Sequence, residues 1–403
     1  MNKKLGLAVA GALVAFSSAA NAGITIPAGD WTVDIGGNVN AYYTHTTFSG
    51  VMQHESSTQT ANTVQTGLLP SALGIGAKTR QNDLDIAFQF TFFTGVDSGA
   101  TASSALGGFN SNDPAHGAAG ANTLNIRQAF MTVGDASWGQ FKLGRDLGVF
   151  GSDAILNDMT LLGVGVGAGA GGSSTLGRIG SGYVYADWVG QIQYQSPNWN
   201  GFQFTAAVRE PWTNSATNAA ANSVIRSDMG FEGKVTYDFA ANDVTGRVWL
   251  SGITQKMNSD SGPDTNNYTA EGWDIGGKVA YQGAQLVGYY YDGKGLDSNT
   301  YTTGGLMFLT NGYKTKDSGG YVQATYVIPG VGTKLGASWG ESKSTVDNGG
   351  PDVKNESWIV GAYHPLTKSL NVVAEYTEQK ISSDYYADSG KAKTVSLGAI
   401  LFF

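Results

Sequence analysis

Apolar and polar residues alternate along much of this chain with a period of two. Segments 84–93, 202–209 and 273–281 each place apolar side chains at every second position, with mostly polar or small residues between them. Residues 394–403 repeat the pattern and end on an aromatic residue. Such alternation predicts β-strands with one face toward an apolar medium and the other toward a polar one.

The connections between these segments alternate in length. Eight long stretches rich in Gly, Asn and other polar residues alternate with seven short turns, which predicts about sixteen antiparallel strands. No segment after the N-terminal region has the ~20 consecutive apolar residues that a membrane-spanning helix needs. Because an unpaired backbone group in hydrocarbon costs several kcal/mol, a membrane sheet must close on itself. We therefore predict an all-β fold, a closed antiparallel transmembrane β-barrel wide enough for an aqueous channel.

Composition supports a membrane barrel over a soluble sandwich. Charged residues make up 14% of the chain, whereas a soluble domain usually has about a quarter. Aromatic residues reach 11%, and yet the mean hydropathy is slightly negative, at −0.15. An apolar outer surface around a wet interior accounts for both values.

The N-terminus has the pattern of a secretory signal peptide. Lys3 and Lys4 precede a short apolar stretch, and Ala20-Asn21-Ala22 forms a cleavage pattern, which predicts a signal peptide over 1–22 and a barrel domain over 23–403. Its removal makes the formal net charge of −8 more negative by two. An acidic protein of this kind is a poor candidate for binding nucleic acid. The chain has no cysteine, which excludes disulfides and thiolate chemistry.

Three motifs resemble the Gram-negative trimeric general porin family. They are residues 139–156, which contain a Gly-Arg pair at a strand end, the Tyr-x-Ser-Pro turn over 194–202, and the terminal Phe403. The resemblance implies a 16-stranded outer-membrane barrel whose long third loop folds into the lumen, and passive diffusion of ions and small hydrophilic solutes. It also implies a homotrimer in contact with outer-membrane lipid and lipopolysaccharide, and a terminal Phe403 that the barrel-assembly machinery reads.

In this family, basic wall residues face acidic residues of the third loop across a constriction. Arg145 matches one wall arginine, and Lys142 is close to it in the sequence. Asp153 and Asp158 fall in the inward loop, where a purely solvated role is an equally good interpretation. Strand parity adds further inward basic residues. The candidate constriction residues are therefore Arg145, Lys142, Arg127, Lys78, Arg80, Asp153 and Asp158.

The sequence departs from the family pattern where selectivity is set. Ala72 and Gln195 stand at positions where related porins often carry arginine, and residues 161–172 form an apolar, glycine-rich loop in place of an acidic one. Parity predicts a mixed lumen in which inward basic residues are balanced by inward acids. The basic residues are Arg127, Arg209, Lys234, Arg247 and Lys278, and the acids include Asp85, Glu232, Asp274 and Glu375. From the acidic net charge we expect a weak cation preference.

Two other functional classes stay open. A channel specific for a sugar or organic solute is one, with Tyr183, Tyr185 and Trp188 along the solute path. An enzyme or adhesin carried on the loops is the other. The four histidines are scattered without metal-ligand spacing, and segments 167–172 and 260–271 resemble nucleotide and calcium loops only superficially. We therefore expect no enzymatic activity, no cofactor and no metal site.

Overall fold

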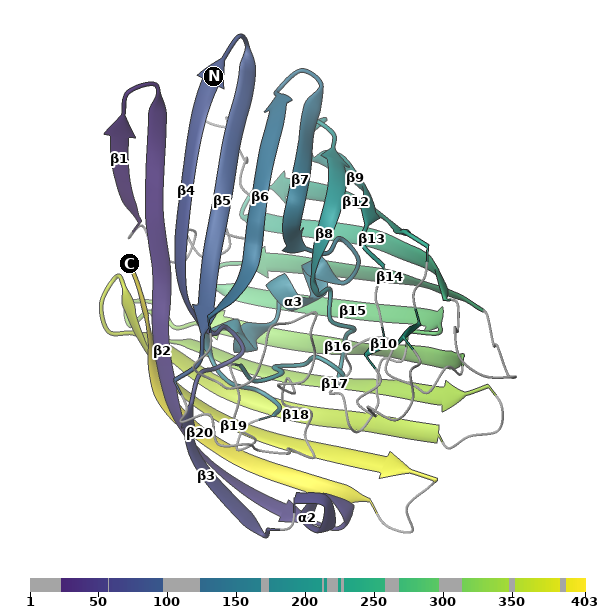
Figure 1. Cartoon of the computed structure of the whole chain (residues 1–403). Helices are drawn as coiled ribbons and strands as arrows, with labels where there is room; N and C mark the ends of the chain where they lie inside the picture. The colour runs from purple at the N-terminus through teal and green to yellow at the C-terminus, as the bar shows by residue number, and fades with distance from the viewer. Residues whose placement is uncertain are drawn as a thin grey trace.

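A computed structural model describes residues 23–56, 58–96, 124–167, 174–211, 214–215, 224–225, 228–257, 268–296, 314–347, 352–384 and 389–403. The predicted signal peptide, the calcium-like loop around 260–266 and part of the glycine-rich segment lie outside these residues. The described chain forms a closed barrel of antiparallel strands (Figure 1). The predicted fold class is confirmed.

Sixteen strands form the barrel wall, and the short strands β1 and β3 complete an 18-stranded sheet. The wall strands are β2 (Trp31–Ser49), β4 (Ser71–Gln81), β5 (Leu84–Thr94), β6 (Asn125–Asp135), β7 (Gly139–Leu147), β8 (Trp188–Gln195), β9 (Phe202–Arg209), β12 (Gly230–Ala241), β13 (Val244–Met257), β14 (Tyr268–Tyr281), β15 (Ala284–Lys294), β16 (Thr315–Val327), β17 (Lys334–Val346), β18 (Asp352–Pro365), β19 (Leu370–Ser383) and β20 (Gly390–Phe402).

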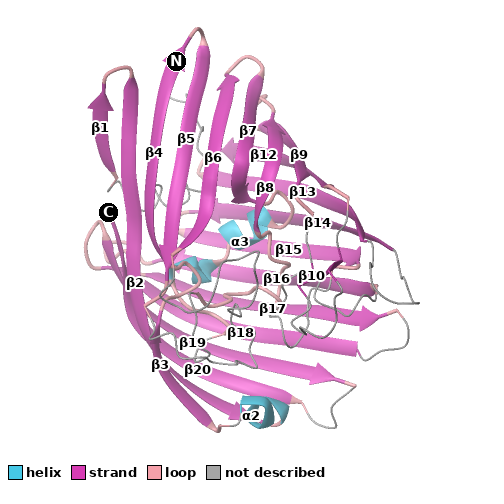
Figure 2. Ribbon diagram, viewed as in Figure 1, coloured by secondary structure: helices cyan, strands magenta, loops and turns pink. Residues whose placement is uncertain are grey.

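The remaining elements lie at the ends of the wall or in connections, as Figure 2 shows. They are β1 (Ile24–Ala28), β3 (Thr60–Gln65), the two-stranded pair β10 (Asn214–Ser215) and β11 (Val224–Ile225), the helices α2 (Val51–Ser56) and α3 (Ser152–Leu156), and the 3-10 helix η1 (Met159–Leu162). Among the described residues, no helix is both long enough and apolar enough to cross a membrane.

Strand β2 closes the barrel because it pairs with both ends of the sheet. Residues 38–49 pair with 391–402 of β20, and residues 32–38 pair with 72–78 of β4. Its 19 residues make this double pairing possible. The closure satisfies the backbone groups that an open edge would leave in hydrocarbon.

Burial follows the predicted alternation on most of the wall. Phe90, Ile275 and Leu397 are 45%, 50% and 53% exposed, and they belong to the apolar outer face. Their chain neighbours Asp274 and Ser396 are buried and point inward. The period-two prediction is thus confirmed by an apolar outer band and a largely polar inner face.

Candidate functional site: the third loop in the barrel lumen

The connection between β7 and β8, residues 148–187, folds into the barrel and is called L3 below. Figure 1 shows its helix α3 inside the ring of strands. Of the described residues of L3, 148–167 lead away from the end of β7, and 174–187 return to the start of β8. The two runs are held together by the backbone hydrogen bonds Val166 N to Gly177 O and Leu176 N to Val166 O. L3 is therefore a flattened hairpin within the lumen.

Carboxylates of the barrel wall fix the outgoing run of L3 by accepting backbone hydrogen bonds. Glu232 on β12 accepts from the Val149 amide at 2.6 Å, and Asp274 on β14 accepts from Gly151 at 3.1 Å. On the far side, Glu375 on β19 accepts from Val164 and Gly165, both at 2.8 Å. Strand parity predicts that all three acids face inward, as observed. Their role is to hold the loop, because they satisfy amides that no strand partner satisfies.

A buried arginine fixes the returning run. Arg178 is 0% exposed, and its guanidinium donates to the Ser338 hydroxyl on β17 and the Ser357 hydroxyl on β18. Its backbone amide donates to Asp158, which also accepts from the Tyr183 hydroxyl at 2.8 Å. Burial lowers the pKa of Arg178 to about 10 and raises that of Tyr183 well above its ordinary value. Asp158 therefore ties the two runs of L3 together.

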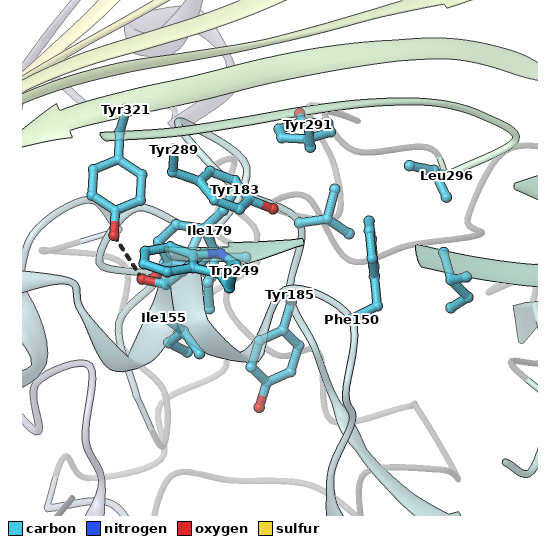
Figure 3. Close-up of a cluster of buried hydrophobic side chains, with 14 of the residues drawn as sticks. Phe150, Ile155, Ile179, Tyr183, Tyr185, Trp249, Tyr289, Tyr291, Leu296 and Tyr321 are labelled. Atoms are coloured by element: carbon cyan, nitrogen blue, oxygen red, sulfur yellow. Dashed lines mark hydrogen bonds between the residues drawn. The ribbon is translucent and has the colours of Figure 1, made fainter. Parts of the chain in front are cut away.

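An apolar cluster lies between L3 and the wall strands β13–β16. Phe150, Ile155 and Ile179 of L3 pack with Trp249 and Tyr289 of the wall, and Figure 3 shows their side chains converging. The Tyr321 hydroxyl donates to the Ala154 carbonyl at 2.8 Å within the same cluster. On these strands the inward face is not the wetted polar surface that the alternation predicts. The reason is that L3 covers it, and burial of apolar area stabilises the covered arrangement.

The predicted acidic residue Asp153 meets two basic wall residues. Its carboxylate accepts from Lys234 Nζ on β12 at 2.7 Å and from an Arg247 guanidinium nitrogen on β13 at 3.2 Å. Burial alone would raise the pKa of Asp153, but the two cations lower it below the ordinary aspartate value. The acidic residue of L3 and the two basic residues of the wall therefore form ion pairs with one another.

The predicted basic residue Lys142 is also paired. Its ammonium group contacts the Asp146 carboxylate four residues along β7, and Asp146 accepts from the Gln128 amide at 2.8 Å. A second buried pair joins Arg209 to Glu232 at 2.7 Å. Lys142 and Arg209 therefore each have a carboxylate neighbour, which cancels most of the field of these two cations on a passing ion.

Arg145 and Arg127 lie close to the root of L3. Because Lys142 and Asp146 face inward, alternation places Arg145 on the other side of β7. Arg127 lies at the register shift between β5 and β6, with its guanidinium 5.2 Å from the centre of the Phe93 ring. The structure brings Asp153 to Lys234 and Arg247 rather than to these two arginines.

Lys78 and Arg80 lie near the short-turn end of the barrel. Lys78 forms an ion pair with Asp34 at 3.3 Å, and Arg80 pairs with Asp85 and Asp135, each at 2.8 Å. Both basic side chains are about half exposed, at 56% and 49%. They belong to the mouth of the lumen and are separated along the barrel from L3.

Sequence reasoning missed Arg178 and the wall serines that receive it. Nothing in the sequence marks Arg178, because it follows a glycine-rich segment without a strand pattern. Ser338 and Ser357 have inward parity on β17 and β18, but small polar residues are expected throughout a wet lumen. Only the path of L3 across the lumen brings Arg178 to Ser338 and Ser357.

The described geometry defines a class of protein: an outer-membrane β-barrel channel narrowed by an internal loop. A Gram-negative porin family model matches residues 8–384, and the chain belongs to that family. It forms an outer-membrane channel for passive diffusion. The family's short turns are periplasmic and its long loops extracellular, so Lys78 and Arg80 lie at the periplasmic mouth.

Solved structures share this fold. The outer membrane channel DcaP of Acinetobacter baumannii aligns with TM-score 0.64 and 16% identity, over 95% of this chain and 100% of that one. The anion-selective porin from Comamonas acidovorans gives TM-score 0.58 and 15% identity, over 93% and 100%. OmpF of Salmonella typhi, in complex with daunomycin, gives 0.58 and 17%, over 94% and 100%. No curated protein sequence matches the chain.

Proposed function

We propose that the channel is constricted at the level of L3 and passes ions and small hydrophilic solutes with little ion selectivity. The burial pattern carries this proposal. Inward side chains at the level of L3, such as Gln128 and Thr132, are 0% and 5% exposed. Toward the periplasmic mouth, inward Asp34 and Asp238 are 44% and 41% exposed. The lumen therefore widens from a narrow zone into a periplasmic vestibule.

Weak selectivity follows from the internal pairing of charges. Lys142 with Asp146, and Asp153 with Lys234 and Arg247, leave little net field at the constriction. In this proposal Lys142, Asp153 and Asp158 act at the constriction, while Lys78 and Arg80 act at the mouth. Arg145 and Arg127 stay predictions as constriction residues, as does the weak cation preference.

A sugar-specific channel receives less support. Tyr183 and Tyr185, which would line a solute path in that alternative, are 0% and 4% exposed and belong to the apolar cluster under L3. Membership of the porin family favours a channel over a loop-borne enzyme. We propose that the protein has no enzymatic activity.

We propose a homotrimer, inserted by the barrel-assembly machinery into a membrane of lipid and lipopolysaccharide, after removal of residues 1–22. Family membership supports the trimer, and one structural neighbour, OmpT of Vibrio cholerae, is described as a trimer form. The terminal Phe403 supports the assembly route, since it directly follows β20 and extends the pairing of β20 with β2 that closes the barrel.

Planar-bilayer recording of the purified protein tests these proposals together. We expect conductance steps in groups of three, a reversal potential near zero in a salt gradient, and no block by neutral sugars. Block by a sugar at low concentration would favour the specific channel. Absence of conductance from correctly folded protein would contradict the diffusion role.

A further inference from the structure

The periplasmic vestibule contains a row of small and hydrogen-bonding side chains on the wall opposite Lys78. Thr245, Ala280, Gln285, Thr325 and Gly336 lie on β13 to β17 as successive cross-strand partners. Four of them, all but Gly336, line a cavity of about 310 Å³ that also includes Lys334 and the turn residue Asp243. The small side chain of Ala280 leaves space in the cavity, and Thr245, Gln285 and Thr325 offer hydroxyl and amide groups. Gly336, beside the cavity, lies against Met159 of L3.

Two lysines that form no direct ion pair with a described carboxylate flank this row. Lys334 lies on β17 two residues before Gly336, and its ammonium group is 4.7 Å from the centre of the Tyr363 ring. Lys278 lies on β14 two residues before Ala280. Neither lysine forms an ion pair with any residue that the structure describes, in contrast to Lys142, Arg209 and Lys234.

The position of Lys278 adds to the positive potential of the row. It is the direct cross-strand partner of Arg247, and like charges opposite one another repel. Arg247 is compensated by Asp238 through hydrogen bonds of 2.6 and 2.7 Å and by Asp153. Asp153 and Asp238 act on Lys278 at longer range as well. No carboxylate among the described residues pairs directly with the Lys278 ammonium group, so a mobile anion can do so.

We propose that this row is a binding subsite for small hydroxylated organic anions, with Lys334 holding the carboxylate or phosphate group and Thr245, Gln285 and Thr325 bonding the hydroxyls. Lys278 is the next cation toward L3 and guides the anion between the constriction and the cavity. Asp243, on the rim, accepts from hydroxyls and disfavours a second anionic group at that end. The inference rests on the proposed diffusion function and adds a solute class to it.

The test is block of single-channel current by gluconate added from the periplasmic side, with glucose as the neutral probe of similar size. We expect gluconate to block at concentrations where glucose has no effect. Lys334→Met should raise the half-blocking concentration about fivefold, the scale of one screened ion pair, and Lys278→Met should raise it less. Lys316→Met, at the extracellular end of β16 and 65% exposed, removes the same charge far from the cavity and should change nothing.

Two further measurements separate the components of the site. Thr325→Val should weaken block by gluconate and leave block by acetate unchanged, because acetate has no hydroxyl. Glucose 6-phosphate in place of gluconate shows whether phosphate or carboxylate is preferred. The subsite alone would be overturned if the channel conducts potassium chloride but gluconate and glucose block it equally. The same conclusion follows if Lys334→Met has no effect on block by gluconate. Loss of conductance from the folded wild-type protein would contradict the underlying diffusion function instead.

Discussion

The Glu375 carboxylate on β19 accepts a 2.8 Å hydrogen bond from the backbone amide of Val164 at the far end of L3. The residues are 211 positions apart in the sequence, so the bond forms only when L3 has crossed the lumen. The same carboxylate accepts from Gly165 and from the Tyr363 hydroxyl. Since all three donors are buried, the loop loses its fixed position if the acceptor is changed.

Glu375→Gln should therefore loosen L3 while preserving side-chain size. One oxygen of the carboxylate becomes an NH₂ group that cannot accept from Tyr363 or the amides, and we expect a loss of about 1–3 kcal/mol in loop docking. Single-channel recordings should show noisier current with more frequent transitions. Glu378→Gln on the same strand is the matched control, because Glu378 is 29% exposed and pairs with Lys391. Equal noise in both variants would contradict the anchoring role.

Arg178 provides a second anchor that can be tested separately. Arg178→Met removes the hydrogen bonds to Ser338 and Ser357 and leaves those buried hydroxyls without the donor. We expect a cost of about 1.5–3 kcal/mol, the range for hydrogen bonds to a charged group. The midpoint of thermal unfolding in detergent should fall, and limited proteolysis should cut L3 more readily. Arg178→Lys should recover part of the loss, and identical behaviour of both variants would exclude a hydrogen-bonding role.

The barrel itself was predictable from local sequence because each wall strand obeys the same rule. Apolar residues such as Phe90 and Ile275 must face lipid, which imposes a period of two on every strand. Turn length then gave the strand count. Closure of the barrel was expected because an open edge would leave backbone groups unpaired in hydrocarbon. The sequence did not show that β2 achieves this closure by pairing with both β20 and β4.

The site was less predictable because L3 brings together residues that share no local pattern. Parity identified Glu232 and Asp274 as inward acids, but it could not tell a solvated acid from one that holds a backbone amide. Trp249 and Tyr289 also have inward parity, and only the loop explains aromatic residues there. Long-range docking of a non-repetitive loop depends on its full path, which strand periodicity does not encode.

The pairing of Asp153 predicts how the channel responds to acid. Because its pKa is lowered, the stabilisation from Lys234 and Arg247 is fully present above the ordinary aspartate range and is lost as the pH falls through the lowered value. We expect Asp153 to keep the α3 part of L3 docked down to mildly acidic pH. Asp153→Asn should remove this contribution at all pH values. Conductance of both proteins recorded from neutral to strongly acidic pH gives the comparison.

The same variant should change ion selectivity. Asp153→Asn leaves Lys234 without its carboxylate and leaves Arg247 with Asp238 alone. The net positive charge near the constriction rises, so the reversal potential in a salt gradient should move toward anion preference. Asp347→Asn, in the exposed ion pair with Lys316 outside the lumen, serves as the control. An unchanged reversal potential in Asp153→Asn would show that permeating ions do not pass near this cluster.

Phe403 joins barrel closure to assembly. Its carbonyl accepts from the Gly37 amide at 2.9 Å, and its own amide donates to the Gly37 carbonyl at 3.1 Å, so the last residue extends the pairing of β20 with β2. Deletion of Phe403 removes both bonds and the terminal aromatic ring, and we expect the amount of heat-modifiable barrel in the outer membrane to fall severalfold. Phe403→Trp keeps the backbone bonds and an aromatic terminus and should assemble normally, whereas Phe403→Ala keeps only the bonds. If Phe403→Ala fails to assemble while Phe403→Trp assembles normally, the aromatic ring is responsible for the effect. Normal assembly of the deletion variant would show that Phe403 is not an assembly signal.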